Sequence, residues 1–340
     1  MTTVFRASTP KIVRPTPGSV KTAHIVGITG GRFHARPGLT RGGTEQSMNL
    51  LGAKASDEEM KILLSSSAES LRAALLPHAS TATVEAEYGD VVVEGTIATL
   101  AHHGARAGNP CPCLCNPASA GNIDVFGLSH IDLDTIGGVL GLLGTRPGPR
   151  SFWGLAAHVD IHGPHKVGES GASPKDLAQL FAYWAWSETH RCLPPRDGSV
   201  IDVTDYVADA TETLCGILDD DPEMLALGHE WYSKKEELNK NSFLERAGNV
   251  LVRVHVEFVN GLYIDPNGQA AKAVVAYNPA KGGVTISLAD PILGVSCVEI
   301  AQALWGPLAG GRAGIAGSPR GKRMCLDDLV KVRDALVTVL

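Results

Sequence analysis

Long apolar stretches and aromatic side chains are scarce in this sequence of 340 residues. No stretch approaches the roughly 18 apolar residues that a membrane-spanning helix needs, and no apolar run of signal-peptide length follows the first methionine. The sequence therefore predicts a cytoplasmic protein that does not interact with membranes. Aromatic residues make up only 5% of the chain, whereas 38 Gly and 20 Pro indicate many tight turns, as in a loop-rich α/β enzyme.

An excess of positive charge and a pattern of paired cysteines are also lacking. The formal net charge is −6, which excludes a protein that grips a long nucleic acid through a basic surface, so the expected substrate is a small anion. The seven cysteines are odd in number and do not have the pattern of a disulfide framework, so we expect reduced thiols. A homodimer is compatible with these features, and the oligomeric state stays open.

The order of strand-like and helix-like segments predicts an α/β protein with more than one domain. Ile123–Ser129 has the pattern of a buried strand, and Ile136–Leu143 is small and apolar enough for a helix that packs on a sheet. We predict a parallel-sheet metal-binding domain at 123–245 and a smaller α+β C-terminal domain at 246–340. Residues 1–122 are expected to form an N-terminal α+β extension that acts as a lid or specificity region.

Further elements are expected on both sides of residue 123 from the spacing of apolar residues. Pro222–Arg246 is either a long polar helix or a linker. Helices are expected at Ser56–Leu76, Asp176–Ser187, Val203–Leu218, Val298–Leu304 and Leu326–Leu340. Strands are expected at His24–Thr29, within Thr81–Ala101, and at Phe152–Asp160, Val250–Val259, Leu262–Ile264, Lys272–Tyr277 and Val284–Leu288.

A histidine and two carboxylates directly follow an apolar strand in the segment Ser129-His-Ile-Asp-Leu-Asp134. Side chains two residues apart in an extended segment point to the same side, so His130, Asp132 and Asp134 are expected to converge on one cation. The carboxyl end of a strand is also where open α/β sheets place their sites. The alternative is a turn in which an Asp caps the following helix.

A second cluster of the same kind is His158-Val-Asp-Ile-His-Gly-Pro-His165. Its imidazoles and carboxylate suit Mn, Fe or Zn better than Mg or Ca. Together the two clusters would build a two-metal site, in which bridging carboxylates hold both cations and a water molecule is activated for hydrolysis. A solvated, histidine-rich surface turn is the alternative for this second cluster.

A glycine-rich segment at 310–321 lies near the C-terminus. Glycines let backbone N–H groups approach an anion, and an arginine can hold a phosphate through two parallel hydrogen bonds. A turn that binds nothing has the same composition, because turns also need glycine. The expected substrate-binding residues are Gly310, Gly311, Arg312, Ser318 and Arg320.

Two of these segments resemble one known family. The first motif of the DHH phosphoesterases, in which a His and two Asp bind metal after an apolar strand, is similar to GLSHIDLDTIGGVLGLLG. The DHH-associated C-terminal domain, with its Gly-Gly…Ala-Gly substrate loop, is similar to VAYNPAKGGVTISLADPILGVSCVEIAQALWGPLAGGRAGIAGSPRG. The resemblance covers roughly residues 123–330. It implies a metal-dependent hydrolase that cleaves a small phosphorylated or nucleotide substrate, such as a phosphodiester, in a cleft between the two domains.

The same resemblance implies roles for individual residues. Asp160 and His162 match a degenerate Asp-His-His motif, in which Ile161 replaces one histidine, and Arg312 stands where the family usually has His. The implied cofactor is a divalent metal, two Mn per chain, with Zn or Fe as alternatives. The expected catalytic residues are Asp134, Asp160 and His162. The expected metal ligands are His130, Asp132, Asp134, His158, Asp160, His162 and His165.

Two alternative functions stay open. A metal-dependent amide or imide hydrolase would use the His158–His165 cluster, and a non-catalytic anion-binding or nucleotide-binding protein would explain the loss of a histidine at Ile161. Separately, His102 and His103 precede Cys111-Pro-Cys-Leu-Cys115. That segment is an ordinary reduced loop, a zinc site, or the source of a catalytic thiolate with one of these histidines as its base.

Overall fold

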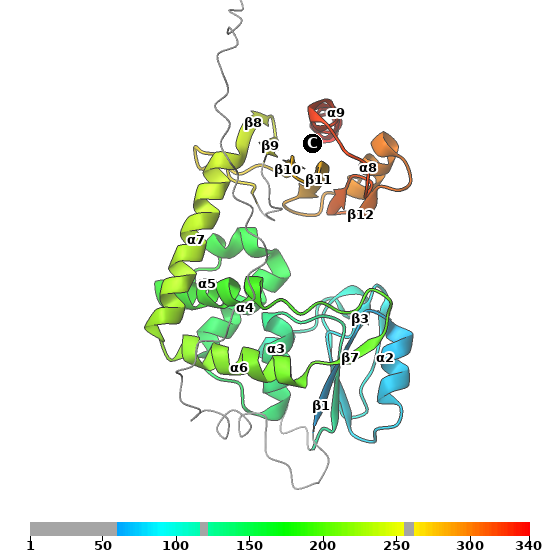
Figure 1. Cartoon of the computed structure of the whole chain (residues 1–340), viewed down its shortest axis with the longest axis vertical. Helices are drawn as coiled ribbons and strands as arrows, with labels where there is room; N and C mark the ends of the chain where they lie inside the picture. The colour runs from blue at the N-terminus through cyan, green and yellow to red at the C-terminus, as the bar shows by residue number, and fades with distance from the viewer. Residues whose placement is uncertain (1–59, 116–121, 255–261) are drawn as a thin grey trace, which may run out of the picture. The chain divides into compact units, whose positions relative to one another are not determined.

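The structure is a computed structural model that describes residues 60–115, 122–254 and 262–340 (Figure 1). The strand predicted at His24–Thr29 lies outside these ranges. Within them the chain is a mixed α/β protein, as predicted, with a mainly parallel sheet, flanking helices and a separate C-terminal sheet with its own helices. Among the described helices, none has both the length and the apolar composition that crossing a membrane requires.

The first sheet has five strands in the order β5-β2-β6-β1-β7, and all neighbours are parallel except β1 and β7. Its strands are β1 (Lys61–Ser65), β2 (Thr81–Val84), β5 (Ala98–Leu100), β6 (Val125–Leu128) and β7 (Val200–Asp202). The short strands β3 (Glu87–Tyr88) and β4 (Val91–Val92) pair with each other. Strand β6, which follows residue 122, lies between β2 and β1, which precede it, so the boundary predicted there falls inside one sheet.

Helices cover both faces of this sheet (Figure 1). Side chains alternate between the faces along each strand. Leu71 of α2 packs with Val125 on one face, and Ile62 packs with Val139 of α3 and Val207 of α6 on the other. The helices are α2 (Ala68–Leu75), α3 (Leu133–Leu143), α4 (Arg150–His162), α5 (Pro174–Thr189), α6 (Thr204–Leu218) and α7 (Pro222–Ser242).

Two predicted elements of this region are wrong. In its described part, the segment predicted as a helix at Ser56–Leu76 is the strand β1 followed by the helix α2. The N-cap of α2 is Ser67, whose side chain accepts a hydrogen bond from the Ser70 backbone N–H. The strand predicted at Phe152–Asp160 is helix α4. Short apolar runs are ambiguous, because a buried strand and a buried helix segment share the same composition.

The C-terminal sheet has six strands in the order β12-β13-β11-β10-β9-β8, of which only β9 and β10 are parallel neighbours. Helices α8 (Cys297–Trp305) and α9 (Leu326–Val339) share a core with it, and Leu262–Ile264 contributes a single bridge instead of the predicted strand. The strands are β8 (Phe243–Ala247), β9 (Val250–Val254), β10 (Ala273–Asn278), β11 (Gly283–Leu288), β12 (Gly310–Arg312) and β13 (Ile315–Gly317).

Candidate metal centre

Polar side chains follow three neighbouring strands of the first sheet. Strands β5, β2 and β6 are parallel, with Val84 in register with both Leu100 and Leu128, so their carboxyl ends meet at one edge of the sheet. Glu85 follows β2, the pair His102 and His103 follows β5, and His130 follows β6. This edge is where open α/β sheets place their binding sites.

Glu85 lies at the middle of this edge and is fully buried. Its Oε1 lies 2.8 Å from His102 Nε2 and 3.2 Å from His103 Nε2. Its Oε2 accepts a hydrogen bond of 2.9 Å from Thr135 Oγ1 and lies 3.1 Å from His130 Nε2. The backbone of Glu85 has φ of 49°, a conformation that side-chain-bearing residues rarely adopt and that is common at functional sites.

Three carboxylate oxygens surround a single nitrogen of His102. His102 Nε2 lies 2.8 Å from Glu85 Oε1, 3.0 Å from Asp160 Oδ2 and 3.3 Å from Asp134 Oδ2. One N–H can donate to only one of them, and the oxygens Asp134 Oδ2 and Asp160 Oδ2 are buried without a hydrogen-bond partner in the described part of the chain. Buried carboxylate oxygens of this kind require a cation, and a bound metal ion would satisfy them.

The donor atoms form three overlapping groups in which all atoms lie within 4.8 Å of one another. Imidazole, carboxylate and thiol donors together suit transition metals, so these groups can hold a metal ion. The groups are Glu85, His102, His103 and Asp160; His102, Cys111, Asp134 and Asp160; and Glu85, His130 and Asp132.

The charges of the cluster call for added positive charge. Burial alone would raise the pKa of Glu85, but hydrogen bonds from the histidines hold that pKa well below its usual range. Burial alone would lower the pKa of His130, but Asp132 and Glu85 raise it to about 10. Asp134 and Asp160 likewise raise the pKa of His102 far above its ordinary value against the effect of burial. The carboxylates therefore favour the protonated, positively charged form of these histidines. A divalent cation would supply the same positive charge.

A short helical turn, η2 (Pro112–Leu114), supports this cluster. The Cys113 backbone N–H donates to Asp134 Oδ1 at 2.9 Å, which orients the other oxygen of that carboxylate. The turn packs closely on α3, because a Cβ on Gly137 would lie 2.5 Å from both Cys113 Cβ and the Trp153 ring. A glycine is therefore required at 137 for η2 to reach the cluster.

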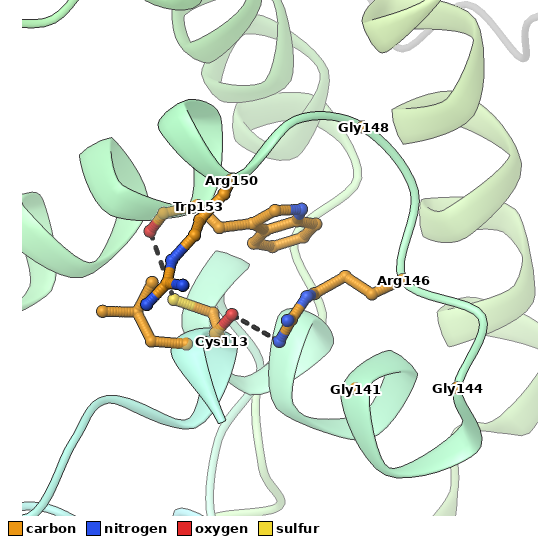
Figure 2. Close-up of a pocket in the computed structure, with 8 residues that line it drawn as sticks. Cys113, Gly141, Gly144, Arg146, Gly148, Arg150 and Trp153 are labelled. Carbon is orange, nitrogen blue, oxygen red and sulfur yellow. Dashed lines mark hydrogen bonds between the residues drawn. The ribbon is translucent and has the colours of Figure 1, made fainter. Parts of the chain in front are cut away.

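A cavity of about 280 Å³ adjoins the same turn (Figure 2). Arg146 Nη1 donates to the Cys113 carbonyl oxygen, and the Cys113 thiol lies 3.5 Å from the Trp153 carbonyl oxygen (Figure 2). The same Nη1 also donates to the Cys115 carbonyl oxygen. Arg146 thus fixes the turn from the side of the cavity. The cavity is lined by Cys113, Leu114, Gly141, Gly144, Arg146, Gly148, Arg150 and Trp153.

The first predicted cluster belongs to the centre, but its residues do not converge on one cation. His130 and Asp132 join Glu85, whereas Asp134 joins His102. The reason is that the segment is extended only up to Asp132, and α3 starts at the next residue. Asp132 also accepts a hydrogen bond of 2.9 Å from the Thr135 backbone N–H, so the capping role considered as the alternative is present as well.

The second predicted cluster contributes only Asp160. In a helix, residues two positions apart point in nearly opposite directions, so His158 and His162 lie on the other side of α4 from Asp160. His158 Nε2 lies 2.9 Å from the Lys166 carbonyl oxygen, and the rings of His158 and His162 are 4.6 Å apart. His165 lies in the turn η3 (Pro164–Glu169) and belongs to none of the three groups.

Four residues of the centre were not in the predicted ligand set. His102, His103 and Cys111 were noted as a separate zinc or thiolate site, and the structure joins them to Asp134 and Asp160. Glu85 was not considered. Its signal is similar to that of His130, since it is an ionisable residue directly after the buried strand β2.

The five residues of the predicted substrate loop lie outside the three groups. Gly311 has φ of 148°, and a Cβ there would lie 2.3 Å from the Ile315 carbonyl oxygen, so the pairing of β12 with β13 requires this glycine. Ser318 Oγ accepts a hydrogen bond of 3.0 Å from the Val284 backbone N–H. Arg312 and Arg320 are exposed, and Gly310 pairs with Gly317 in the same hairpin.

Comparisons with known proteins give no family. No family model and no curated protein matches the chain. One solved structure with weak similarity is an uncharacterized protein from Helicobacter pylori G27, with 12% sequence identity and a TM-score of 0.20. The match covers 56% of this chain and 60% of that one. The function of this protein therefore has to be argued from the site itself.

Proposed function

We propose that the protein is a metal-dependent hydrolase that cleaves a phosphoester in a small phosphorylated or nucleotide substrate. The proposal rests on one observation: three carboxylate oxygens crowd around the single nitrogen His102 Nε2, and two of them are buried without a hydrogen-bond partner among the described residues. One imidazole N–H cannot satisfy three buried carboxylates, whereas a metal cation can accept a bond from each of them.

The overlap of the three groups favours two cations. Glu85 and Asp160 each belong to two groups, as expected for carboxylates that bridge neighbouring ions. Divalent cations bound there would polarise a phosphoryl oxygen and make a water molecule nucleophilic at neutral pH. The protein contributes the fixed positions: Glu85 is held by Thr135, and Asp134 is held by the Cys113 backbone N–H. Mn, Zn and Fe are the candidate metals.

The resemblance to the DHH phosphoesterases supports the choice of phosphorus over carbon. The His and two Asp of the first motif, at 130, 132 and 134, all belong to the centre. The expected Asp-His-His motif is not continuous at 160–162, but the adjacent pair His102 and His103 lies 3.0 Å and 3.6 Å from Asp160 Oδ2. An aspartate and two histidines are thus brought together from two separate segments.

The amide-hydrolase alternative has less support. It requires His158, Asp160, His162 and His165 to act as one cluster, and α4 directs His158 and His162 away from Asp160.

A small anionic substrate and its binding by Arg312 and Arg320 remain part of the proposal, because exposed arginines can hold a phosphate.

The test is hydrolysis of a panel of phosphodiesters and phosphomonoesters, including bis-p-nitrophenyl phosphate, by the full chain with Mn²⁺ or Zn²⁺ added. We expect turnover that falls by more than about 100-fold in Asp134→Asn, because removal of even an outer-shell partner of a metal costs 10–100-fold. Asp209→Asn, an exposed aspartate on α6 outside the three groups, is the matched control and should keep full activity. A metal-loaded protein that hydrolyses no member of the panel, or an Asp134→Asn variant with full activity, would contradict the proposal.

A further inference from the structure

One of the three groups contains a sulfur donor. Cys111 is 1% exposed, and its Sγ lies 3.6 Å from His102 Nδ1. Its donor atom lies within 4.8 Å of those of His102, Asp134 and Asp160. The other two groups have only nitrogen and oxygen donors.

The position of Cys111 is fixed by the same contacts that fix Asp134. Cys111 is the residue before η2, whose Cys113 backbone N–H donates to Asp134 and whose Cys113 carbonyl oxygen accepts from Arg146. The thiol and the carboxylate are therefore held by one short turn. A metal site needs this kind of support, because outer contacts determine how well the ligands are oriented.

The thiol is accompanied by oxygens that lack partners. Asp134 Oδ2 and Asp160 Oδ2 are the two buried oxygens of the centre without a hydrogen-bond partner among the described residues, and both belong to the group of Cys111. One thiol, one imidazole and two carboxylates make four donors, the number that Zn²⁺ takes in most protein sites. Thiolates select Zn²⁺ and similar ions, whereas sites with only oxygen and nitrogen donors also take Mn²⁺.

We propose that Cys111 is a metal ligand, and that His102, Cys111, Asp134 and Asp160 form a position for a thiolate-binding ion such as Zn²⁺, Fe²⁺ or Co²⁺. Glu85, His130 and Asp132 form a second position that has no sulfur. The two positions of the centre therefore differ in metal preference. This inference rests on the metal-binding part of the proposed function and is independent of the reaction that the protein catalyses.

The test is a titration of the metal-free full chain with Co²⁺, followed by absorption spectroscopy. A thiolate that binds Co²⁺ gives a charge-transfer band in the near ultraviolet. We expect this band in the wild-type chain, its displacement by Zn²⁺ but not by Mg²⁺, and its loss in Cys111→Ser, in which Zn²⁺ affinity falls by at least about 10-fold. Cys297→Ser is the matched control, since Cys297 is equally buried but lies in α8 of the C-terminal region, outside the three groups, so it should keep the band.

The other outcomes separate this inference from the proposed function. Co²⁺ that binds to the wild-type chain without the band would overturn the role of Cys111 and leave a metal centre of nitrogen and oxygen donors. Wild-type protein that binds no Co²⁺ would overturn the metal centre itself. If circular dichroism shows that Cys111→Ser does not fold, X-ray absorption of the zinc-loaded wild-type chain decides the question. A Zn–S distance of about 2.3 Å supports the ligand, and a shell with only the shorter Zn–N and Zn–O distances excludes it.

Discussion

The edge of the five-stranded sheet and the glycine-rich hairpin of the C-terminal sheet both have the composition of a binding site, but they differ in how their polar groups are paired. At the sheet edge, Asp134 and Asp160 each have a buried oxygen without a hydrogen-bond partner in the described part of the chain. In the hairpin, Gly311 and Ser318 are used by strand pairing. Composition alone therefore does not distinguish a metal-binding site from a glycine-rich turn. Buried carboxylate oxygens that lack a hydrogen-bond donor do distinguish them.

The largest expected effect comes from Glu85→Gln, which changes a carboxylate that belongs to two of the three groups. We expect metal content to fall and metal affinity to drop by at least about 100-fold, because the carboxylate lies between three histidines. Mass spectrometry of the metal content is the measurement. Glu69→Gln, at an exposed site in the first turn of α2, should keep all of its metal. Equal metal content in both variants would remove the distinction between the two regions.

Removal of the metal should affect the stability of the chain. A ligand present at 100 times its dissociation constant stabilises the folded state by about 2.7 kcal/mol, so a chelator should lower the Tm by a few degrees. Scanning calorimetry with and without chelator measures this effect, and Mn²⁺ or Zn²⁺ added back should restore the Tm. The same Tm in both conditions would argue that the carboxylates are satisfied by protonated histidines alone.

A smaller and more selective effect is expected from Arg312→Ala in the hairpin. This exposed arginine should change neither metal content nor, beyond about 0.5 kcal/mol, the free energy of unfolding. If the hairpin binds the substrate, KM rises while the metal content stays constant. Lost metal in this variant would show that the two regions do not act separately.

The smallest expected effect concerns a carboxylate that is exposed and fully paired. Burial alone would raise the pKa of Glu188, but the hydrogen bonds from Trp231 and Lys235 and the nearby positive charges together lower that pKa below its ordinary value. Its contribution to stability is therefore complete above the unfolded pKa and is lost as the pH falls through the lower folded pKa. Glu188→Gln should lower the free energy of unfolding by less than about 1 kcal/mol at pH 7, as measured by urea denaturation. The difference from the wild-type chain should disappear in acid, and a difference that persists there would have another cause.

Part of the centre could be predicted from the sequence because the rule behind it is local. A charged residue that follows an apolar strand lies at the edge of the sheet, and this rule finds His130 and would also have found Glu85. The fold class follows from similar local patterns. Helices such as α5 and α6 were predicted close to their observed bounds, because their apolar residues recur with helical spacing over more than ten residues.

The remaining part depends on contacts between distant segments. Asp160 reaches the centre from the last turn of helix α4, and Cys111 reaches it because η2 packs on the small residue Gly137. Neither contact has a signal in the neighbouring sequence. Once 150–162 is a helix, the spacing that favoured His158 and His162 as ligands directs both of them away from Asp160.

The most direct test of the account is the metal content per chain of the full protein, purified without chelator and without an affinity metal. We predict about two divalent ions per chain, at least one of them Zn or Fe, and a lower content in Asp134→Asn than in Asp209→Asn. A chain that contains no metal, and that binds none after Mn²⁺ and Zn²⁺ are added, would contradict the account.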